Sequence, residues 1–421
     1  MTQIRIIGDS GKGPTMEKRE VVFVEGVRTA FGRLGGSLKD FTAEQLGSLT
    51  LRGLVAKTKI CERGIVDSVF AGSAFHMSHA INPARWITLD AGLPVTTPAS
   101  FIEVQCGSSI DCINHAAWKI LCGQADTIIA GGMESFSQLP FKFSSSTAPY
   151  RITPPRLLDY QLQPAPKEGR AYAPFEMGLT AENLQALYGI SRQEQDEFAF
   201  RSQTLAKKAM DAGYFEDEIV TVLISQGKKK PPIEFKKDEH PRLSSLEDLA
   251  NLPPAFKKGG TVTAGNSSGL NDGAAFMLMM DKERAHEYGY KPVAKWICGA
   301  EYALDPSIMG VAPAYAIPIA LKRAGLKLSD VDIIECNEAF AAQNLAVIKE
   351  LEKQTGEKVN LSKWNPLGGA IAFGHANGAS GARCAMFTMR QLARTGGKYG
   401  LFSACCGGGQ GIVSIVENLQ K

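Results

Sequence analysis

The sequence lacks a strong charge of either sign, a disulfide pattern and a long apolar run. Its 46 Lys and Arg residues nearly balance 43 Asp and Glu residues, so we expect no general attraction to nucleic acid or to an anionic membrane. Nine cysteines without disulfide-framework spacing predict reduced thiols in an intracellular compartment. The absence of a secretory signal and of an apolar span of about 20 residues predicts no membrane insertion.

Neither end of the sequence resembles a known targeting signal. Residues 1–15 have no hydrophobic period, and we expect an N-terminal extension there: a leader, a processed remnant or a tail. This extension lacks the Arg- and Ser-rich, acid-poor composition of a good transit peptide, and the C-terminus is not a peroxisomal signal. The mitochondrial matrix and the cytoplasm both remain open.

The pattern of apolar runs predicts an α/β protein. A chain of 421 residues is long enough for two or three domains. Short apolar runs bounded by glycine predict strands at 127–130, 331–334, 400–403 and 412–416, and helical periodicity predicts helices at 109–121, 180–210 and 314–324. Segments 109–132 and 380–409 each run from a small-residue helix start to a strand that ends in glycines, which hints at a duplication.

Two distant cysteines, Cys106 and Cys405, are the candidate reacting groups. Cys106 follows an extended segment and precedes a helix, so we expect the helix N-terminus to stabilise its thiolate. Cys405 precedes three glycines. A thiolate beside an imidazole such as His375 can accept an acyl group from a thioester, and a second thiol can move a proton on a second substrate. This pairing predicts chemistry at a carbon–carbon bond.

Most other thiols and imidazoles are interpreted as structural. A buried cysteine usually acts as a small apolar side chain, and we expect Cys406 to pack away from its neighbour Cys405. His76 and His79 lack a third ligand, so no metal site is predicted. The remaining residues that we assign to structure are Cys61, Cys112, Cys122, Cys298, Cys336, Cys384, His115 and His286.

A series of motifs in order resembles the thiolase family from about Val21 to the C-terminus. They are VRTAFG (27–32), NPAR (82–85), EVQCGSS (103–109), AGGMES (130–135), MGLTAEN (177–183), TAGNSSG (263–269), NEAF (337–340), GGAIAFGH (368–375) and CCGGG (405–409). The resemblance implies a thiolase fold, a duplicated five-layered αβαβα architecture with an inserted loop domain, and a homodimer or homotetramer. The implied divisions are residues 16–137 plus 271–291 for the N-terminal half, 138–270 for the loop domain and 292–421 for the C-terminal half.

The same resemblance implies roles for individual residues. Cys106 would carry the acyl group, with the amides of Cys106 and Gly407 as an oxyanion hole. His375 would act as base, Asn337 would hold a water for a second oxyanion hole, and Cys405 would move the α-proton. The residues implied to contact the substrate are Ser268 at the pantetheine, Arg242 near the adenine, Met177 and Phe340 at the pantetheine end and acyl pocket, and Met309 beside the acyl group.

We therefore expect a thiolase that uses coenzyme A thioesters as substrates and holds no tightly bound cofactor. The expected substrates are short-chain 3-oxoacyl-CoAs such as acetoacetyl-CoA, with 2-methylacetoacetyl-CoA as a further one. The alternatives are a medium- or long-chain 3-ketoacyl-CoA thiolase of β-oxidation and a non-catalytic acyl-CoA or lipid-binding relative. A 3-oxoacyl synthase is disfavoured by Cys405. Three departures from the family pattern are Glu176 in place of a histidine, Ala376 in place of proline and Ser109 in place of glycine.

Overall fold

The structure is a computed structural model that describes residues 19–75, 80–143, 157–159 and 176–420. The expected N-terminal extension, residues 1–15, lies outside the described residues, as do His76 and His79. No helix within the described ranges is long and apolar enough to cross a membrane.

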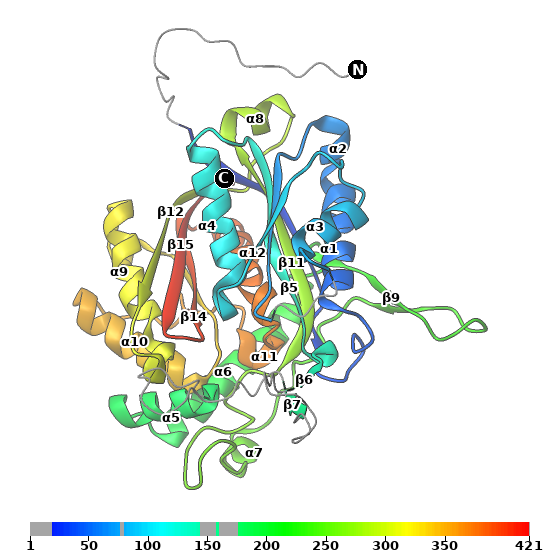
Figure 1. The fold of residues 1–421 in the computed structure, drawn as a ribbon. Helices are drawn as coiled ribbons and strands as arrows, with labels where there is room; N and C mark the ends of the chain where they lie inside the picture. The colour runs from blue at the N-terminus through cyan, green and yellow to red at the C-terminus, as the bar shows by residue number, and fades with distance from the viewer. Residues whose placement is uncertain (1–18, 76–79, 144–156, 160–175, 421) are drawn as a thin grey trace, which may run out of the picture.

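Two groups of strands form the centre of the molecule (Figure 1). The first has the order β1-β11-β5-β3-β4, and the second has the order β13-β14-β15-β12. Strands β1 and β12 pair at Val22–Lys295 and Phe23–Ala294, which joins both groups into one sheet of 11 strands. The strands are β1 (Val21–Thr29), β2 (Gly32–Arg33), β3 (Ser68–Gly72), β4 (Ala99–Ile102), β5 (Thr127–Ser135), β8 (Ile219–Val220), β11 (Asn271–Asp281), β12 (Ala294–Ala303), β13 (Ile333–Cys336), β14 (Tyr399–Cys406) and β15 (Gln410–Asn418).

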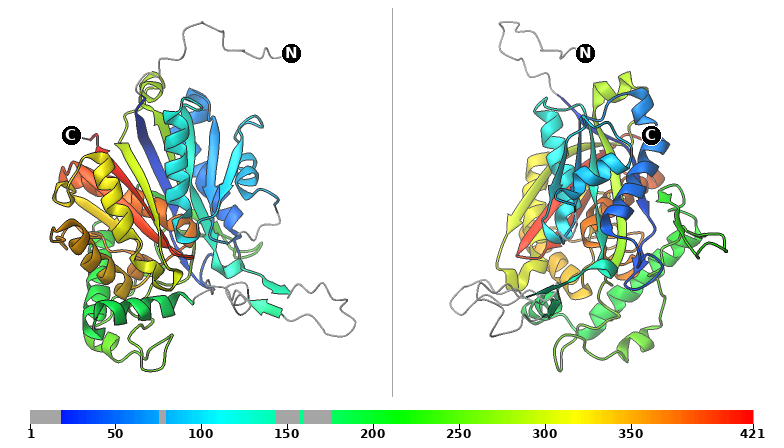
Figure 2. Two further views of the ribbon diagram at one scale, coloured as in Figure 1. Left: turned by 60° about the vertical axis from the view of Figure 1, so that its left-hand side comes forward. Right: turned by 45° about the vertical axis from the view of Figure 1, so that its right-hand side comes forward.

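Helices lie between the two groups of strands and on both outer sides (Figure 2). Helices α1 (Ala43–Thr58) and α3 (Pro83–Asp90) cover the outside of the first group. Helices α4 (Ser108–Leu121) and α12 (Asn377–Thr395) contact each other and both groups. Helix α9 (Pro313–Ala324) covers β12 and β15, and α10 (Ala341–Thr355) packs on α9. The observed order is therefore α-β-α-β-α, and the predicted α/β class is confirmed.

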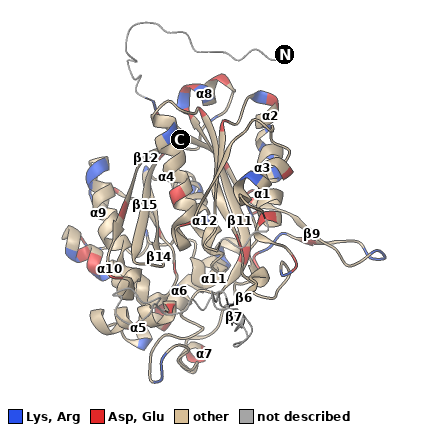
Figure 3. Ribbon diagram, viewed as in Figure 1, with Lys and Arg blue, Asp and Glu red and all other residues tan. Residues whose placement is uncertain are grey.

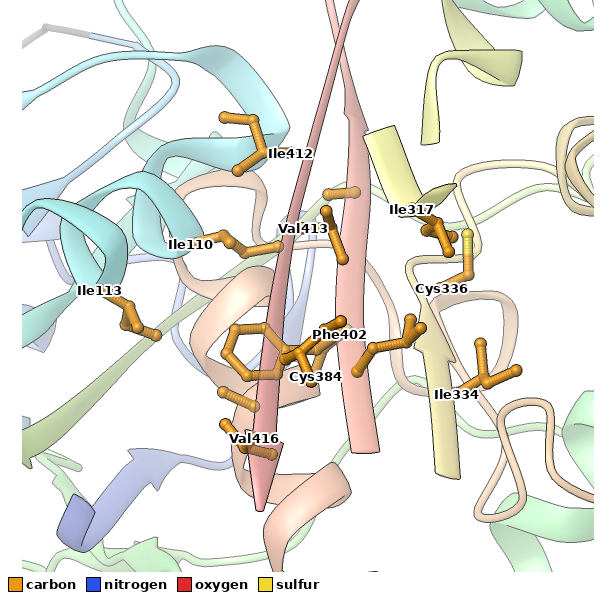
Figure 4. Packing of buried hydrophobic residues seen from close by; sticks show 14 of the residues in the cluster. Ile110, Ile113, Ile317, Ile334, Cys336, Cys384, Phe402, Ile412, Val413 and Val416 are labelled. Carbon is orange, nitrogen blue, oxygen red and sulfur yellow. The ribbon is translucent and has the colours of Figure 1, made fainter. Parts of the chain in front are cut away.

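The buried core explains why the middle helices stay in place. Figure 4 shows β14 and β15 with Ile110 and Ile113 of α4 on one side and Ile317 of α9 on the other. These side chains are fully buried. Because apolar burial contributes about 25 cal/mol per Å², a sheet covered on both faces is strongly held. Charged residues instead lie on outer helices such as α8 (Lys282–Glu287), the end of α9 and α10 (Figure 3).

The segment between β5 and β11 leaves the main sheet and forms mostly helices and small hairpins. Its elements are β6 (Phe141–Phe143), β7 (Leu157–Asp159), α5 (Met177–Tyr188), α6 (Arg192–Asp211), β9 (Val222–Ile224), β10 (Ile233–Phe235) and α7 (Leu246–Ala250), with β8 returning to pair with β1. The domain boundaries expected at 137/138, 270/271 and 291/292 remain predictions. The shorter elements elsewhere are α2 (Ile60–Arg63), η1 (Gln105–Gly107), η2 (Phe136–Gln138), η3 (Pro306–Val311), η4 (Leu328–Asp330) and α11 (Ala370–Phe373).

Most predicted elements are found, and one is wrong. The predicted strands at 127–130, 400–403 and 412–416 lie inside β5, β14 and β15, while the strand expected at 331–334 begins two residues later, at Ile333. The single helix expected at 180–210 is instead two helices. Gly189 ends α5 with φ 58°, a left-handed value that favours glycine. Ser191 then starts α6 with a capping box to Glu194.

A buried ion cluster fixes the inserted segment to β1. The Arg28 guanidinium is fully buried, with Nε 2.6 Å from Glu218 and Nη1 2.7 Å from Asp238. Its second terminal nitrogen donates to the other Asp238 oxygen at 2.8 Å. Arg390 of α12 lies 3.2 Å from Glu218. The cluster therefore connects β1, the inserted segment and α12.

We predict that Arg28→Met lowers the free energy of unfolding by about 3–5 kcal/mol, because it removes the cation that two buried carboxylates share and leaves Arg390 as a partner for Glu218 alone. The matched control is Arg52→Met, which removes the exposed Arg52–Asp90 pair and should cost less than about 1 kcal/mol. Chemical denaturation of both variants, monitored by circular dichroism, measures the difference. Equal losses in the two variants would contradict the prediction.

Candidate active site

Cys106 lies in a strained turn immediately before α4. It occupies the middle of η1, which contacts α12 and β14, and is only 7% exposed. The preceding Gln105 has φ 48°, a value that is unusual for a residue with a side chain. Gln105 Nε2 donates to the Ala74 carbonyl at 3.2 Å and to Glu103 at 2.6 Å. Such strain often occurs at functional sites, where the surroundings hold it in place.

The Cys106 thiol is protonated in this environment. Burial raises its pKa to about 12, with a further rise from Glu134, and the amides of Gly407 and Cys106 oppose the rise by hydrogen bonding. Burial therefore outweighs the stabilisation of the Cys106 thiolate that we expected from the helix N-terminus. Helix α4 begins two residues later, at Ser108, and desolvation exceeds the effect of the amides. Cys106 needs a base at the moment of reaction.

Cys405 and Cys406 end β14 and point to opposite faces. Cys405 belongs to a small apolar cluster with Met309 and Phe340, whereas Cys406 belongs to the main core. A Cβ atom on Gly107 would lie 2.5 Å from the Cys406 sulfur, so Cys406 packs against the backbone of the Cys106 turn. Neighbouring strand residues alternate between faces, and the expectation that Cys406 packs away from Cys405 is confirmed.

The Cys405 thiol does not titrate near neutral pH, although a thiol that moves a proton in both directions would do so most easily there. Burial raises its pKa well above the usual value, and the charges that Cys106, Cys406 and Cys336 would carry raise it further. The sequence could not reveal this shift, because it depends on complete burial of the side chain.

His375 is held as a neutral imidazole between α11 and α12. Its Nδ1 lies 2.7 Å from the Ser380 hydroxyl, which donates to the Ala376 carbonyl at 3.0 Å. The hydrogen-bond network therefore assigns the proton to Nδ1 and leaves a lone pair on Nε2. Burial, with help from the charge of Arg383, lowers the His375 pKa to about 3. A neutral imidazole with a free Nε2 can accept a proton.

Asn337 is the side chain that faces the unprotonated Nε2 of His375. Its Nδ2 lies 3.4 Å from His375 Nε2, and its position follows from β13, which ends at Cys336. The backbone N–H of His375 donates to Asn271 Oδ1 at 3.0 Å and to the Gly269 carbonyl at 3.1 Å. The structure thus brings Asn337 and His375 together, and the 263–269 loop supports the histidine.

The predicted substrate-binding residues divide into two places. Met309 and Phe340 share the apolar cluster of Cys405, and Met177 packs against it. Ser268 lies beside this wall, since its N–H donates to the Ala339 carbonyl at 2.9 Å. Arg242 is elsewhere, at the rim of a cavity of about 280 Å³ that Ala264 and Gly265 also line. The 263–269 loop therefore runs from this cavity towards His375.

Several side chains of the site were missed by sequence reasoning. Ser380 follows His375 by five residues on α12, a spacing that could have indicated it. Arg383 donates to Asn337 Oδ1 at 3.4 Å, which no sequence pattern showed. The apolar cluster also includes Ala181, Val262, Ala339 and Ala342, with Phe256 packed against it.

The departures from the family pattern leave the backbone intact. Ala376 has φ −77°, a value that proline also adopts, so the chain path does not require proline. Glu176 is exposed at the start of α5 and makes no side-chain cap. Ser109 is buried and accepts from the Ala382 N–H at 3.0 Å.

No cluster of metal-binding side chains occurs within the described ranges.

The pKa shifts predict how Cys106 reacts with iodoacetamide. Because Cys106 is protonated, its alkylation rate should rise with pH from about 6 to about 9, as thiolate becomes available. His375→Ala should slow the reaction by removing the proposed base, whereas His115→Ala, whose imidazole pairs with Asp111 on α4, should not. Mass mapping of Cys106 over time measures both effects. A rate independent of pH and equal in the two variants would indicate a preformed thiolate.

Comparison with known proteins agrees with this geometry. Family models described as "Thiolase, N-terminal domain" and "Thiolase, C-terminal domain" match residues 21–283 and 290–418. An acetyl-CoA acetyltransferase of Syntrophomonas wolfei is 44% identical over 95% of this chain and 100% of its own length. A crystal structure of the Bacillus anthracis acetyl-CoA acetyltransferase has a TM-score of 0.88 at 39% identity, covering 96% of this chain and 99% of that one. Human mitochondrial 3-ketoacyl-CoA thiolase in complex with CoA has a TM-score of 0.86 at 39% identity, covering 95% and 98%. The expected thiolase fold is confirmed.

Proposed function

This chain belongs to the thiolase family, and we propose that it condenses acyl-CoAs and cleaves short-chain 3-oxoacyl-CoAs through an acyl-cysteine intermediate. The observation that carries the proposal is that two buried thiols, Cys106 and Cys405, lie close enough for a charge on Cys106 to raise the pKa of Cys405. The relatives named acetyl-CoA acetyltransferase support the short-chain substrate.

In the first half of the reaction, we propose that Cys106 takes the acyl group. His375 removes the thiol proton as the sulfur attacks the thioester carbonyl, and coenzyme A leaves as a thiol. The amides of Cys106 and Gly407, which already hydrogen-bond the sulfur, suit an oxyanion hole for the tetrahedral intermediate. The neutral state of His375 supports its role as base.

In the second half, His375, which has passed the Cys106 proton to the departing coenzyme A, takes the thiol proton of Cys405. The Cys405 thiolate then removes the α-proton from a second acyl-CoA. The enolate oxygen accepts hydrogen bonds from His375 and from a water that Asn337 holds. The enolate carbon attacks the acyl group on Cys106, the C–S bond breaks, and a 3-oxoacyl-CoA leaves. Because Met309 and Phe340 surround Cys405 with apolar atoms, they would exclude water from the enolate.

Coenzyme A contacts, assembly and compartment are proposed as well. The cavity at Arg242 and the loop with Ser268 are suited to the adenine and pantetheine.

A homodimer or homotetramer is supported by β4, which ends the sheet, and by the exposed apolar side chains of Ile81 and Val95 near it. All nine cysteines are free, which supports a reducing compartment, the cytoplasm or the mitochondrial matrix.

The two thiols should have separable effects. Cys405→Ala should still become acetylated on Cys106 by acetyl-CoA, while condensation falls by about a hundred- to ten-thousandfold, the usual contribution of a general base. Cys106→Ala should lose both steps, and the buried Cys298→Ala should keep both as the control. Intact mass and acetoacetyl-CoA formation measure the steps. Normal condensation by Cys405→Ala would rule out the two-thiol mechanism.

The substrate range should be short but tolerant of an α-methyl group. Met309 is 1% exposed beside Cys405, and its flexible thioether can change rotamer to admit a methyl group. We predict a kcat/KM for 2-methylacetoacetyl-CoA within about tenfold of that for acetoacetyl-CoA. A tenfold change is about 1.4 kcal/mol, the lower part of the roughly 1–3 kcal/mol that one methyl group in an apolar pocket is worth. Thiolysis of both substrates is compared with that of 3-oxohexadecanoyl-CoA.

The same assay decides the second candidate function. The likeness to human mitochondrial 3-ketoacyl-CoA thiolase favours longer substrates as the alternative. A kcat/KM for the 3-oxohexadecanoyl thioester equal to or above that for acetoacetyl-CoA would establish it and reject the short-chain proposal.

A further inference from the structure

Arg383 is a buried cation beneath the proposed site. It lies on α12 with no exposed surface, and its guanidinium carbon is 4.9 Å from the centre of the Phe387 ring. Within the part of the chain that the structure describes, its Nε and Nη1 have no hydrogen-bond partner. Burying a charge with few partners is unfavourable, so stability alone does not account for an arginine here.

Among the residues that the structure describes, the one side-chain oxygen that accepts a hydrogen bond from Arg383 belongs to Asn337. Nη2 of Arg383 donates to Asn337 Oδ1 at 3.4 Å, and it lies equally far from the Cys384 sulfur. The backbone of Asn337 is fixed separately, because its N–H donates to the Ser403 carbonyl at 2.9 Å and its carbonyl accepts from Asn344 at 3.2 Å. These backbone contacts do not determine the orientation of the Asn337 side-chain amide.

Arg383 selects one of the two orientations of this amide. With Oδ1 towards Arg383, the Nδ2 group faces His375 Nε2 at 3.4 Å, a donor opposite a lone pair. A flipped amide would place Nδ2 against the guanidinium, two donors together, and Oδ1 against Nε2, two acceptors together. Both contacts of the flipped state are unfavourable. The guanidinium cannot accept a hydrogen bond from a flipped Nδ2 group, because it carries only donors.

We propose that Arg383 is a positioning residue for the condensation half of the reaction. It holds Asn337 Oδ1 and so presents the Nδ2 group to the neutral His375 of the resting protein and, during condensation, to the water beside the enolate oxygen. The inference rests on the proposed function. The other oxyanion hole, made by the amides of Cys106 and Gly407, contains no atom that Arg383 contacts. Loss of Arg383 should therefore affect condensation and spare acylation of Cys106.

A structural alternative is that Arg383 serves only as a counter-charge for Glu335. Glu335 is buried on β13, two residues before Asn337, and its carboxylate oxygens have no hydrogen-bond partner among the described residues. Burial raises its pKa to about 8, and the charge of Arg383 acts against that rise. If this were the whole role, loss of Arg383 would weaken the fold and reduce both halves of the reaction alike.

The experiment compares the two half-reactions in Arg383→Gln and Arg383→Lys. The control is Arg390→Gln on the same helix, whose guanidinium faces Glu25 and Glu218. The acylation rate is read from coenzyme A release and Cys106 mass with acetyl-CoA, and condensation from acetoacetyl-CoA formation. For Arg383→Gln we expect acylation within about threefold of wild type, and a condensation kcat at least about tenfold lower with KM for acetyl-CoA little changed, as for a weakened oxyanion donor.

A double mutant tests whether Arg383 acts through Asn337. Asn337→Ala should lower condensation by about a hundred- to a thousandfold. Adding Arg383→Gln in that background should change condensation by less than about twofold, because the group that it positions is already absent. Independent, multiplicative losses would overturn the proposal, as would equal losses in acylation and condensation.

Folding of each variant is checked by circular dichroism and thermal unfolding. If Arg383→Gln does not fold, Arg383→Lys, which keeps the charge but lacks the guanidinium's spread of N–H donors, carries the same expectations. A wild-type protein that neither acetylates Cys106 nor forms acetoacetyl-CoA rejects the proposed function itself. An active wild type whose Arg383 variants condense normally rejects the positioning role alone.

Discussion

The position of the site depends on a close backbone contact between β5 and the first turn of α12. A Cβ atom on Gly132 would overlap the carbonyl of Gly378, and a Cβ on Gly378 would overlap the carbonyl of Met133. Only glycine at both positions permits this approach. Glu134 secures it, because its buried carboxylate accepts from the Gly378 N–H at 2.9 Å and from the Ala74 N–H at 2.8 Å. His375, directly before α12, is thereby placed relative to the first group of strands.

This close packing also controls the charges of the reacting groups. Burial raises the pKa of Cys106 to about 12 and lowers that of His375 to about 3, so the resting pair is a neutral thiol and a neutral imidazole. Burial likewise raises the pKa of Glu134 to about 7, against hydrogen bonds from Ser73, Ala74 and Gly378. The protons must then move only when a substrate carbonyl offers a place for the negative charge, which favours reaction over side reactions of a free thiolate.

The sequence was sufficient for the parts that depend on local pattern. Strands β5, β14 and β15 followed from apolar runs, and the reacting residues followed from motifs that resemble a known family. The break between α5 and α6 could also have been predicted, because Gly189 followed by Ser191 and Glu194 is a helix stop and a helix start. The pKa of Cys106 could not, since desolvation depends on side chains from distant segments.

The contact of Arg383 with Asn337, like the pKa of Cys106, could not be predicted from the sequence. The two residues are 46 positions apart, on different elements, and each alone has an ordinary interpretation: a basic residue on a helix and an amide after a strand. Only the fold brings the guanidinium to the oxygen of an amide whose nitrogen faces the base. In the positioning role that we propose, Arg383 neither reacts nor touches substrate but determines which end of the Asn337 amide faces the proposed base.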